Sequence, residues 1–416
     1  MTYSSTNVEQ NRLGRAHFTA LLSMIMALGA LAIDMMLPAF DDMRTHFGLP
    51  ADSTQVAQVV TAFLVGMAVA QAFYGPLADR FGRKPVLYAG FVIYGLGALG
   101  SLLAPTLELV LVSRFIWGIG AASPRVVAVS IVRDTYAGDE MAKAMSFIMA
   151  VFIMVPVVAP TVGAGLILVF PWQSVFAAGL VFVLVVAIWA RVLPETLDPQ
   201  NRLPIDRRAI AAATKEVLTN RQTFGYMMAM TMTFGVFSSY LASSERIFGE
   251  IYEKPDQFPF IFGALAATMG VAILMNASIV ERVGAKRMVH LALATYVAVA
   301  LGFWAIAAAA GGRPSFPIFM VGMMAMLSLH AILIPNFNSI AMLPMGHIAG
   351  TASAVIGTIS LAGGAFLGSI IDRQFTDTVS PLVVSFVLFG IVAQGFIAWA
   401  ERGKLFSRRT ESPGSP

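Results

Sequence analysis

The stretch "GPLADRFGRKPVL", residues 75–87, joins two long runs that lack Asp, Glu, Lys and Arg, 53–78 and 85–107. An apolar run of about 20 residues is long enough to cross a bilayer as a helix. Between the runs, Gly82 permits a tight turn, and three basic residues favour the cytoplasmic side of the membrane. The stretch therefore predicts two membrane spans joined by a short cytoplasmic turn.

The whole chain has the composition of a membrane protein. Of its 416 residues, 57% are hydrophobic and 12% are charged, which is far from the balance of a soluble domain. It contains no Cys, and its five His lack the spacing of metal ligands, so we predict no disulfide, metal or other cofactor. Its basic residues lie between apolar runs and form no single patch, which argues against nucleic acid as a partner.

Further runs of this kind predict an all-α membrane protein with twelve transmembrane helices. Two runs are long enough for two helices each, and they divide at "LVFPWQSV" and "IPNFNSIAMLPMGH", where proline and polar residues gather. Two further spans include charges within an apolar stretch. The predicted spans lie in 18–40, 53–78, 85–107, 107–132, 144–190, 222–244, 257–280, 288–312, 314–371 and 378–400.

The distribution of Lys and Arg predicts that both termini are cytoplasmic. Alternate connections, counted from the N-terminus, hold 20 of these residues, whereas the opposite set holds 5, and cytoplasmic loops carry the excess in membrane proteins. The predicted divisions are an N-terminal six-helix bundle at 1–193, a cytoplasmic linker at 194–221, a C-terminal six-helix bundle at 222–400 and a cytoplasmic tail at 401–416.

The two halves repeat each other. "ADRFGRKPV" at 78–86 aligns with "VERVGAKRM" at 280–288, which places Gly82 opposite Gly284. Such a duplication predicts two parallel six-helix bundles around a central site.

The opening stretch matches G-x-L-A-D-R-x-G-R-K-x-x-L, and in this it resembles the major facilitator superfamily, which has this pattern between its second and third helices. We expect Asp79 to cap a helix or to pair with a cation. With the charges that end the fourth span, the motif is predicted to form a cytoplasmic gate that latches the halves in the outward-open state. The predicted gate residues are Gly75, Asp79, Arg80, Gly82, Arg83, Lys84, Arg133 and Asp134.

The segment "RFIWGIGAASPRVVAVSIVRD", residues 114–134, resembles the fourth helix of proton-coupled drug exporters of that superfamily. Arg114 and Arg125 are about three helical turns apart, so we expect them on one face, which must look into a polar cavity because arginine stays charged. A buried structural pair remains an alternative for Arg125, whose partner the sequence does not reveal.

The segment "VPVVAPTVGAG", residues 155–165, resembles the antiporter motif of the fifth helix through Pro160 and Gly163, and Pro156 is typical of the bicyclomycin-resistance (Bcr/CflA) branch. Three positions depart from the general motif, namely Val155, Ala159 and Ala164. Small residues and prolines also allow helices to pack closely and bend, so a purely structural role is the alternative.

Three more segments resemble the Bcr/CflA drug:proton antiporters: "IDMMLPAF", "FSSYLASSERIFGEIYEKPDQFPFIFG" and "PNFNSIAMLPMGHIAGTASAVIG". The resemblance implies a monomeric antiporter that exports small, drug-like or amphipathic compounds by alternating access while protons enter. Its partners would be the small-molecule substrate, protons and the lipid bilayer of the inner (plasma) membrane. A uniporter or importer of a small metabolite on the same fold is the alternative. A receptor or scaffold would not need charges within its spans, and no catalytic constellation predicts an enzyme.

Asp34 is the candidate proton carrier, because a carboxylate within an apolar span belongs in a protein cavity. If the first span is one helix ending near Phe40, Asp34 and Arg114 lie at a similar depth. Arg114 is then predicted to take part in proton coupling, because burial raises the pKa of a carboxylate and a nearby arginine lowers it, which suits proton exchange near neutral pH. The repeat places Val236 and Phe316 at the equivalent positions of the second half, which argues against a role that the fold itself requires. A structural ion pair between Asp34 and Arg114 is the alternative.

Three other residues are candidates for lining the substrate cavity, Tyr240, His330 and Asn336. For His330, a satisfied interior position is the favoured alternative. Glu245, at the outer end of the seventh span, is more simply an interfacial charge, with proton binding as its other reading.

Overall fold

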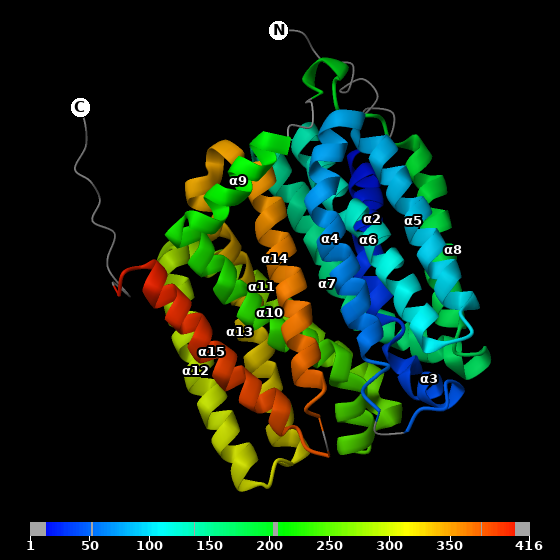
Figure 1. The fold of residues 1–416 in the computed structure, drawn as a ribbon, viewed down its shortest axis with the longest axis vertical. Helices are drawn as coiled ribbons and strands as arrows, with labels where there is room; N and C mark the ends of the chain where they lie inside the picture. Colours follow the sequence, from blue (N-terminus) through cyan, green and yellow to red (C-terminus); the bar gives the residue numbers. More distant parts are fainter. Residues whose placement is uncertain (1–13, 51–52, 137, 203–206, 376, 404–416) are drawn as a thin grey trace.

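The computed structural model describes residues 14–50, 53–136, 138–202, 207–375 and 377–403. Within them the chain is all-helical, which confirms the predicted fold class, and twelve helices have 16 or more residues (Figure 1). The first six are α2 (Arg15–Asp34), α4 (Gln58–Phe81), α5 (Arg83–Leu103), α6 (Leu107–Thr135), α7 (Gly138–Val169) and α8 (Ser174–Trp189). The last six are α10 (Arg221–Arg246), α11 (Phe258–Val283), α12 (Ala285–Ala309), α13 (Phe316–Met342), α14 (Ala349–Asp372) and α15 (Ser380–Ala400).

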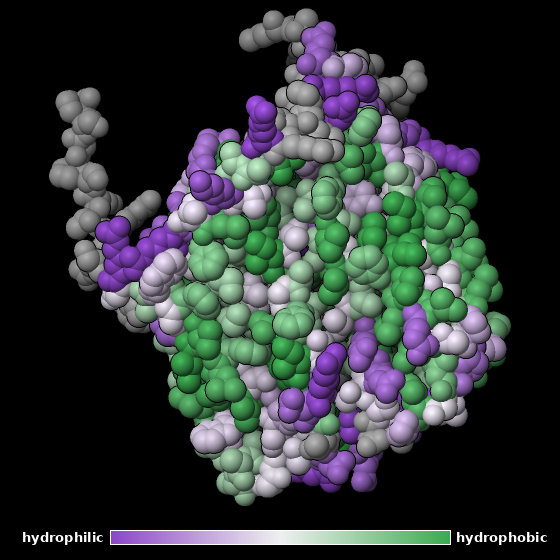
Figure 2. Space-filling view, in the orientation of Figure 1, coloured by the Kyte–Doolittle hydropathy of each residue, from purple (hydrophilic) through white to green (hydrophobic). Residues whose placement is uncertain are grey.

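The surface of the molecule is that of a multi-pass membrane protein. On the face drawn in Figure 2, apolar residues cover most of the middle of the bundle and hydrophilic residues gather towards both ends. Ten helical stretches of the described chain are long and apolar enough to cross a membrane, and the stretch Phe316–Asp372 contains both α13 and α14. The remaining long helix, α10, is less apolar because it buries a series of Ser and Thr residues.

Short elements connect the long helices. Figure 1 shows α3 (Phe40–His46) at one end of the bundle and α9 (Arg207–Thr219) at the other. We call the end with α3 the outer end and the end with α9 the inner end, following the predicted orientation. The helix α9 and the 3-10 turn Pro199–Asn201 lie within the predicted linker 194–221. Parts of this linker and most of the predicted tail 401–416 lie outside the described residues.

The predicted repeat is visible in the backbone. Gly82 separates α4 from α5, Gly284 separates α11 from α12, and both have a positive φ, 105° and 84° respectively. Glycine adopts this conformation without steric cost. At Gly82 a side chain would also collide with the carboxylate of Glu195, since a Cβ would lie 2.6 Å from its Oε2 atom.

Two pairs of helices join the first six to the last six. Helix α4 packs against α14, and α7 packs against α11. The hydroxyl of Thr358 on α14 donates a hydrogen bond of 3.0 Å to the carbonyl of Ala68 on α4. The division of the chain into two moving bundles remains a prediction, and these contacts are where such bundles would meet.

Candidate functional site

Asp34 is the last residue of α2, so the prediction of one unbroken helix across 18–40 is wrong. After a turn the chain continues as a short 3-10 helix, Leu37–Ala39, and then as α3. The cause is Pro38, which lacks an N–H and therefore cannot donate to the carbonyl of Asp34 four residues earlier. Asp34 is only 4% exposed. In the described chain no hydrogen bond or ion pair of its side chain is found.

Arg114 binds the end of α2 through backbone carbonyls. Its Nη1 donates to the carbonyl of Ala32 at 3.0 Å and its Nε donates to the carbonyl of Val59 at 3.3 Å. Ala32 belongs to the last turn of α2, where carbonyls lack helical partners and a positive charge is favourable. Arg114 is completely buried, so it does not share the accessible face that we expected for it together with Arg125. The ion pair with Asp34 is likewise not among those of the described residues.

Aromatic groups surround the same guanidinium. The carbon Cζ of Arg114 lies 4.5 Å from the ring centre of Phe63 and 4.8 Å from that of Trp117. Such contacts stabilise a cation that has left water. Its Nη2 is buried and has no hydrogen-bond partner in the described structure. Arg114 therefore stabilises the packing of the helices next to Asp34, and its Nη2 donor makes no hydrogen bond.

Helix α7 also approaches the end of α2 closely. A Cβ added at Gly163 would overlap the carbonyl of Met35, the residue after Asp34. A glycine at this position allows two backbones to touch. Pro156 and Pro160 lie inside α7, which remains helical through both. The fifth-helix motif thus contacts the backbone of the residue that follows the candidate proton carrier, and this close packing is what Gly163 provides in the structure.

Tyr240 is a residue of the last six helices that lies near Asp34. It lies on α10, is 2% exposed, and interacts electrostatically with Asp34. Its hydroxyl is buried and has no hydrogen-bond partner in the described chain. Its ring stacks on Phe262 of α11 with the ring centres 5.8 Å apart. Asp34 is therefore located where the two sets of six helices meet.

The other predicted cavity residues differ in exposure. His330 is buried and stacks on Phe237 with the ring centres 4.7 Å apart. Asn336 is buried and donates to the Oδ1 atom of Asn276 at 2.9 Å. Arg125, in contrast, is exposed although it lies well inside α6, and no ion pair involving it is found among the described residues. Of these predicted residues, Arg125 is the one that is accessible in this conformation.

The gate motif is connected by ion pairs within the first six helices. Arg83 pairs with Asp79 at 2.5 Å and with Asp134 at 2.8 Å. Arg80 and Arg133 are exposed. A residue that sequence reasoning missed, Glu195, accepts hydrogen bonds from the backbone N–H groups of Arg83 at 2.9 Å and Lys84 at 3.0 Å. It caps the N-terminus of α5, where a carboxylate is favoured by the helix dipole.

The outer end is closed by charges that the sequence did not pair. Arg44 on α3 donates to Glu245 on α10 at 2.7 Å and also lies 3.2 Å from Glu250, which itself pairs with Arg246 at 3.1 Å. We call these four residues the outer ion-pair cluster. The side chains of Arg44 and Glu245 are 5% and 11% exposed. Burial raises the pKa of Glu250, and the two arginines oppose this effect.

The described residues include no group of three or more His, Asp or Glu side chains that could hold a metal ion. The chemistry of the site is therefore that of one buried carboxylate, arginines and aromatic rings between two sets of helices. This combination of fold and buried charges is that of a membrane transporter.

The protein belongs to the Major Facilitator Superfamily, whose sequence profile matches residues 21–369. It is 30% identical over 388 residues to the bicyclomycin resistance protein homolog of Haemophilus influenzae, covering 91% of this chain and 96% of that protein. It is 28% identical over 381 residues to the multidrug resistance protein MdtL of Escherichia coli, covering 88% and 94% of the two chains. These relatives confirm the predicted superfamily and the bicyclomycin-resistance type.

Solved structures show the same fold. A D-xylose-proton symporter superposes with a TM-score of 0.74 at 15% identity, covering 93% of this chain and 99% of that one. The human organic anion transporter MFSD10 gives a TM-score of 0.61 at 17% identity, covering 94% and 97%.

Proposed function

We propose that this protein exports small, drug-like or amphipathic compounds from the cytoplasm in exchange for protons, with Asp34 as the proton carrier. The observation that carries the proposal is the position of Asp34: it is buried, it has no ion pair within the described chain, and it is close enough to Tyr240 of the other half to interact with it electrostatically. A buried carboxylate without a cation changes its energy strongly when it gains or loses a proton. The names of the relatives support drugs as the substrate class.

The proposal includes an orientation and a cycle. The protein acts as a monomer in the bacterial inner membrane with both termini in the cytoplasm, as the excess of basic residues at the inner end supports. The outer ion-pair cluster then closes the external side in this conformation. Exposed Arg125, well inside α6, is placed to meet a substrate that enters from the inner end.

The test is transport by inside-out vesicles with an imposed pH gradient, using bicyclomycin and other small amphipathic antibiotics as the panel. The wild-type protein should accumulate at least one compound and dissipate the gradient when that compound is added. Asp34→Asn should fold and exchange substrate passively but should not accumulate it, because an amide has a similar shape and cannot titrate. Asp42→Asn, which changes an exposed carboxylate of α3, should behave as the wild type.

Two results would refute the proposal. Full accumulation by Asp34→Asn would remove Asp34 from the proton path. Wild-type transport that runs in the direction of the proton flux, as in a proton-coupled importer, or that only equilibrates the compound, as in a uniporter, would reject proton-driven export.

A further inference from the structure

Besides Asp34 and Glu245, another carboxylate is buried at the outer end of the interface. Asp372, the last residue of α14, is 5% exposed. Its Oδ1 atom accepts hydrogen bonds from the hydroxyls of Ser239 at 2.6 Å and Ser243 at 2.7 Å, both on α10. The two serines are four residues apart and therefore lie on one face of that helix. Both bonds use the same oxygen, so Oδ2 has no hydrogen bond in the described structure.

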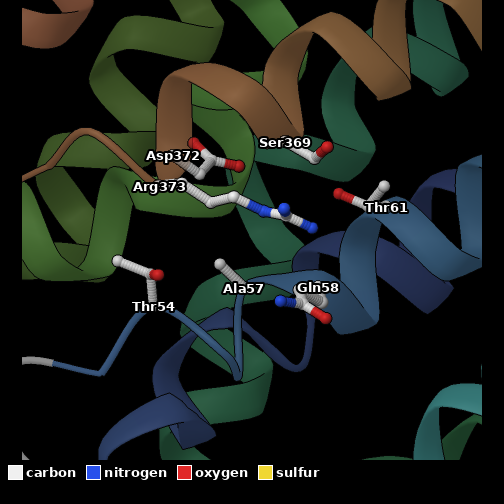
Figure 3. A pocket seen from close by; sticks show the side chains of 7 residues that line it. All are labelled: Thr54, Ala57, Gln58, Thr61, Ser369, Asp372 and Arg373. Carbon is white, nitrogen blue, oxygen red and sulfur yellow. The ribbon is translucent and has the colours of Figure 1, made fainter.

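The charged side chains near Asp372 either pair with other residues or point away from its carboxylate. On α10, Glu245 and Arg246 belong to the outer ion-pair cluster. Arg373 follows Asp372 directly and is exposed, and Figure 3 shows its side chain extending away from the carboxylate towards Thr61. Helices α13 and α15 contain no Asp, Glu, Lys or Arg, and His330 is the titratable group of α13. Within the described residues, Asp372 has no ion pair.

A small cavity connects Asp372 to the first half of the molecule (Figure 3). It has a volume of about 10 Å³, which is near the lower limit for one water molecule. One wall comes from the start of α4 and the residues before it, and the other from the end of α14. The lining residues are Thr54, Ala57, Gln58, Thr61, Ser369, Asp372 and Arg373.

The surroundings suit a carboxylate that exchanges a proton. Burial without a cation disfavours the charged form, whereas hydrogen bonds from two hydroxyls favour it. These opposed effects keep both forms accessible. Opening of the halves at the outer end would separate the two walls of the cavity and expose Asp372 to the external solution.

We propose that Asp372, with Ser239 and Ser243, is a second proton-binding site, loaded from the external side through this cavity and distinct from Asp34. The ligand is a proton delivered by one water molecule. The external direction of loading rests on the proposed function, whereas the binding itself does not. Asp34 and Asp372 belong to different halves, so each half would carry one titrating carboxylate.

Infrared spectroscopy of the purified full-length protein tests the site without any substrate, because a protonated carboxyl group has its own carbonyl stretch band. The measurement is a titration from mildly acidic to mildly alkaline pH in Asp34→Asn protein, which removes the other candidate. We expect a band that disappears with rising pH and is lost when Asp372→Asn is added. Asp377→Asn, a change of an exposed carboxylate near the same end, should leave the band in place.

The serines supply a second readout. Ser239→Ala removes a donor that stabilises the charged form, so the band should persist to higher pH in Asp34→Asn/Ser239→Ala protein. The proposal is overturned if adding Asp372→Asn leaves the titrating band unchanged, or if the band is present but does not respond to pH. Failure of drug export by the wild type would reject the proposed function alone, since this titration does not involve a drug.

Discussion

Removing the charge of Glu245 should open the outer end of the protein. In the structure its carboxylate accepts a bond of 2.7 Å from Arg44 across the interface, and both side chains are nearly excluded from solvent. Glu245→Gln keeps the shape and removes the charge. In the closed conformation Arg44 then stays buried with one charged partner fewer. In the open conformation water can solvate Arg44, so the substitution favours the open conformation.

The size of the effect follows from the burial. Loss of one partner from a buried ion pair costs about 3–5 kcal/mol. Arg44 retains Glu250 at 3.2 Å and Asp41 at 3.5 Å, so we expect the lower end of this range. A cost of about 3 kcal/mol corresponds to a shift of roughly 100-fold in the ratio of closed to open molecules.

Spin-label distances across the outer end measure this ratio. The chain has no Cys, so Gln55→Cys and Asp256→Cys, two exposed positions on opposite sides of the interface, can be labelled without background. Glu245→Gln should convert a mainly short distance distribution into one dominated by a longer distance.

The matched control for this prediction is Asp41→Asn. Asp41 is the exposed partner of the same arginine, with 77% of its side chain accessible, and exposed pairs contribute at most about 1 kcal/mol. Asp41→Asn should therefore leave the distribution close to that of the wild type. If Glu245→Gln and Asp41→Asn give the same distribution, the outer ion-pair cluster does not hold the outer end closed.

Four further changes test the packing of the helices and the roles of individual charged residues. Gly163→Ala should reduce the yield of folded protein, because overpacking costs about 1–3 kcal/mol. Gly165→Ala should keep the yield, because no atom lies within 4 Å of the added Cβ. Size-exclusion profiles of the two variants measure the amount of folded protein. Arg114→Gln should lower folded yield because its guanidinium is fully buried, whereas Arg125→Gln should keep the yield and change which compounds are carried, as growth assays with a drug panel would show. Glu195→Gln should lower the thermal unfolding temperature through a loss of about 1 kcal/mol at the cap of α5, and an unchanged temperature would reject that capping role.

The sequence predicted the helices well because the bilayer leaves few options for an apolar run of about 20 residues. It also located Gly82 and Gly284, since glycine is required where the backbone has a positive φ. The break in α2 was missed although its signal was present, because Pro38 follows Asp34 by four residues. A proline at that distance removes a helical bond and predicts the end of a helix.

Pairings between distant residues could not be predicted. Arg44 and Glu245 are 201 positions apart, and the sequence shows only that each lies near the end of an apolar run. Arg114 was expected to face a polar cavity, with an ion pair to Asp34 as the alternative. In the structure its guanidinium instead donates to two backbone carbonyls and lies against two aromatic rings. Carbonyl acceptors exist at every residue, so their use leaves no pattern in a single sequence. The roles predicted for Asp34, Arg125 and the gate motif remain predictions.

The candidate proton carrier and the outer ion-pair cluster are built from the same two segments. On one side, Asp34 and Arg44 are ten residues apart and are joined by the short helix Leu37–Ala39. On the other side, Tyr240 and Glu245 lie on the same helix, α10. Asp34 interacts electrostatically with Tyr240 and Arg44 forms an ion pair with Glu245, so both interactions cross the interface between the same pair of segments. A change of charge at Asp34 therefore acts directly on the two segments whose separation opens the outer end. Proton binding and opening can be coupled through these segments alone, without a chain of intermediate residues.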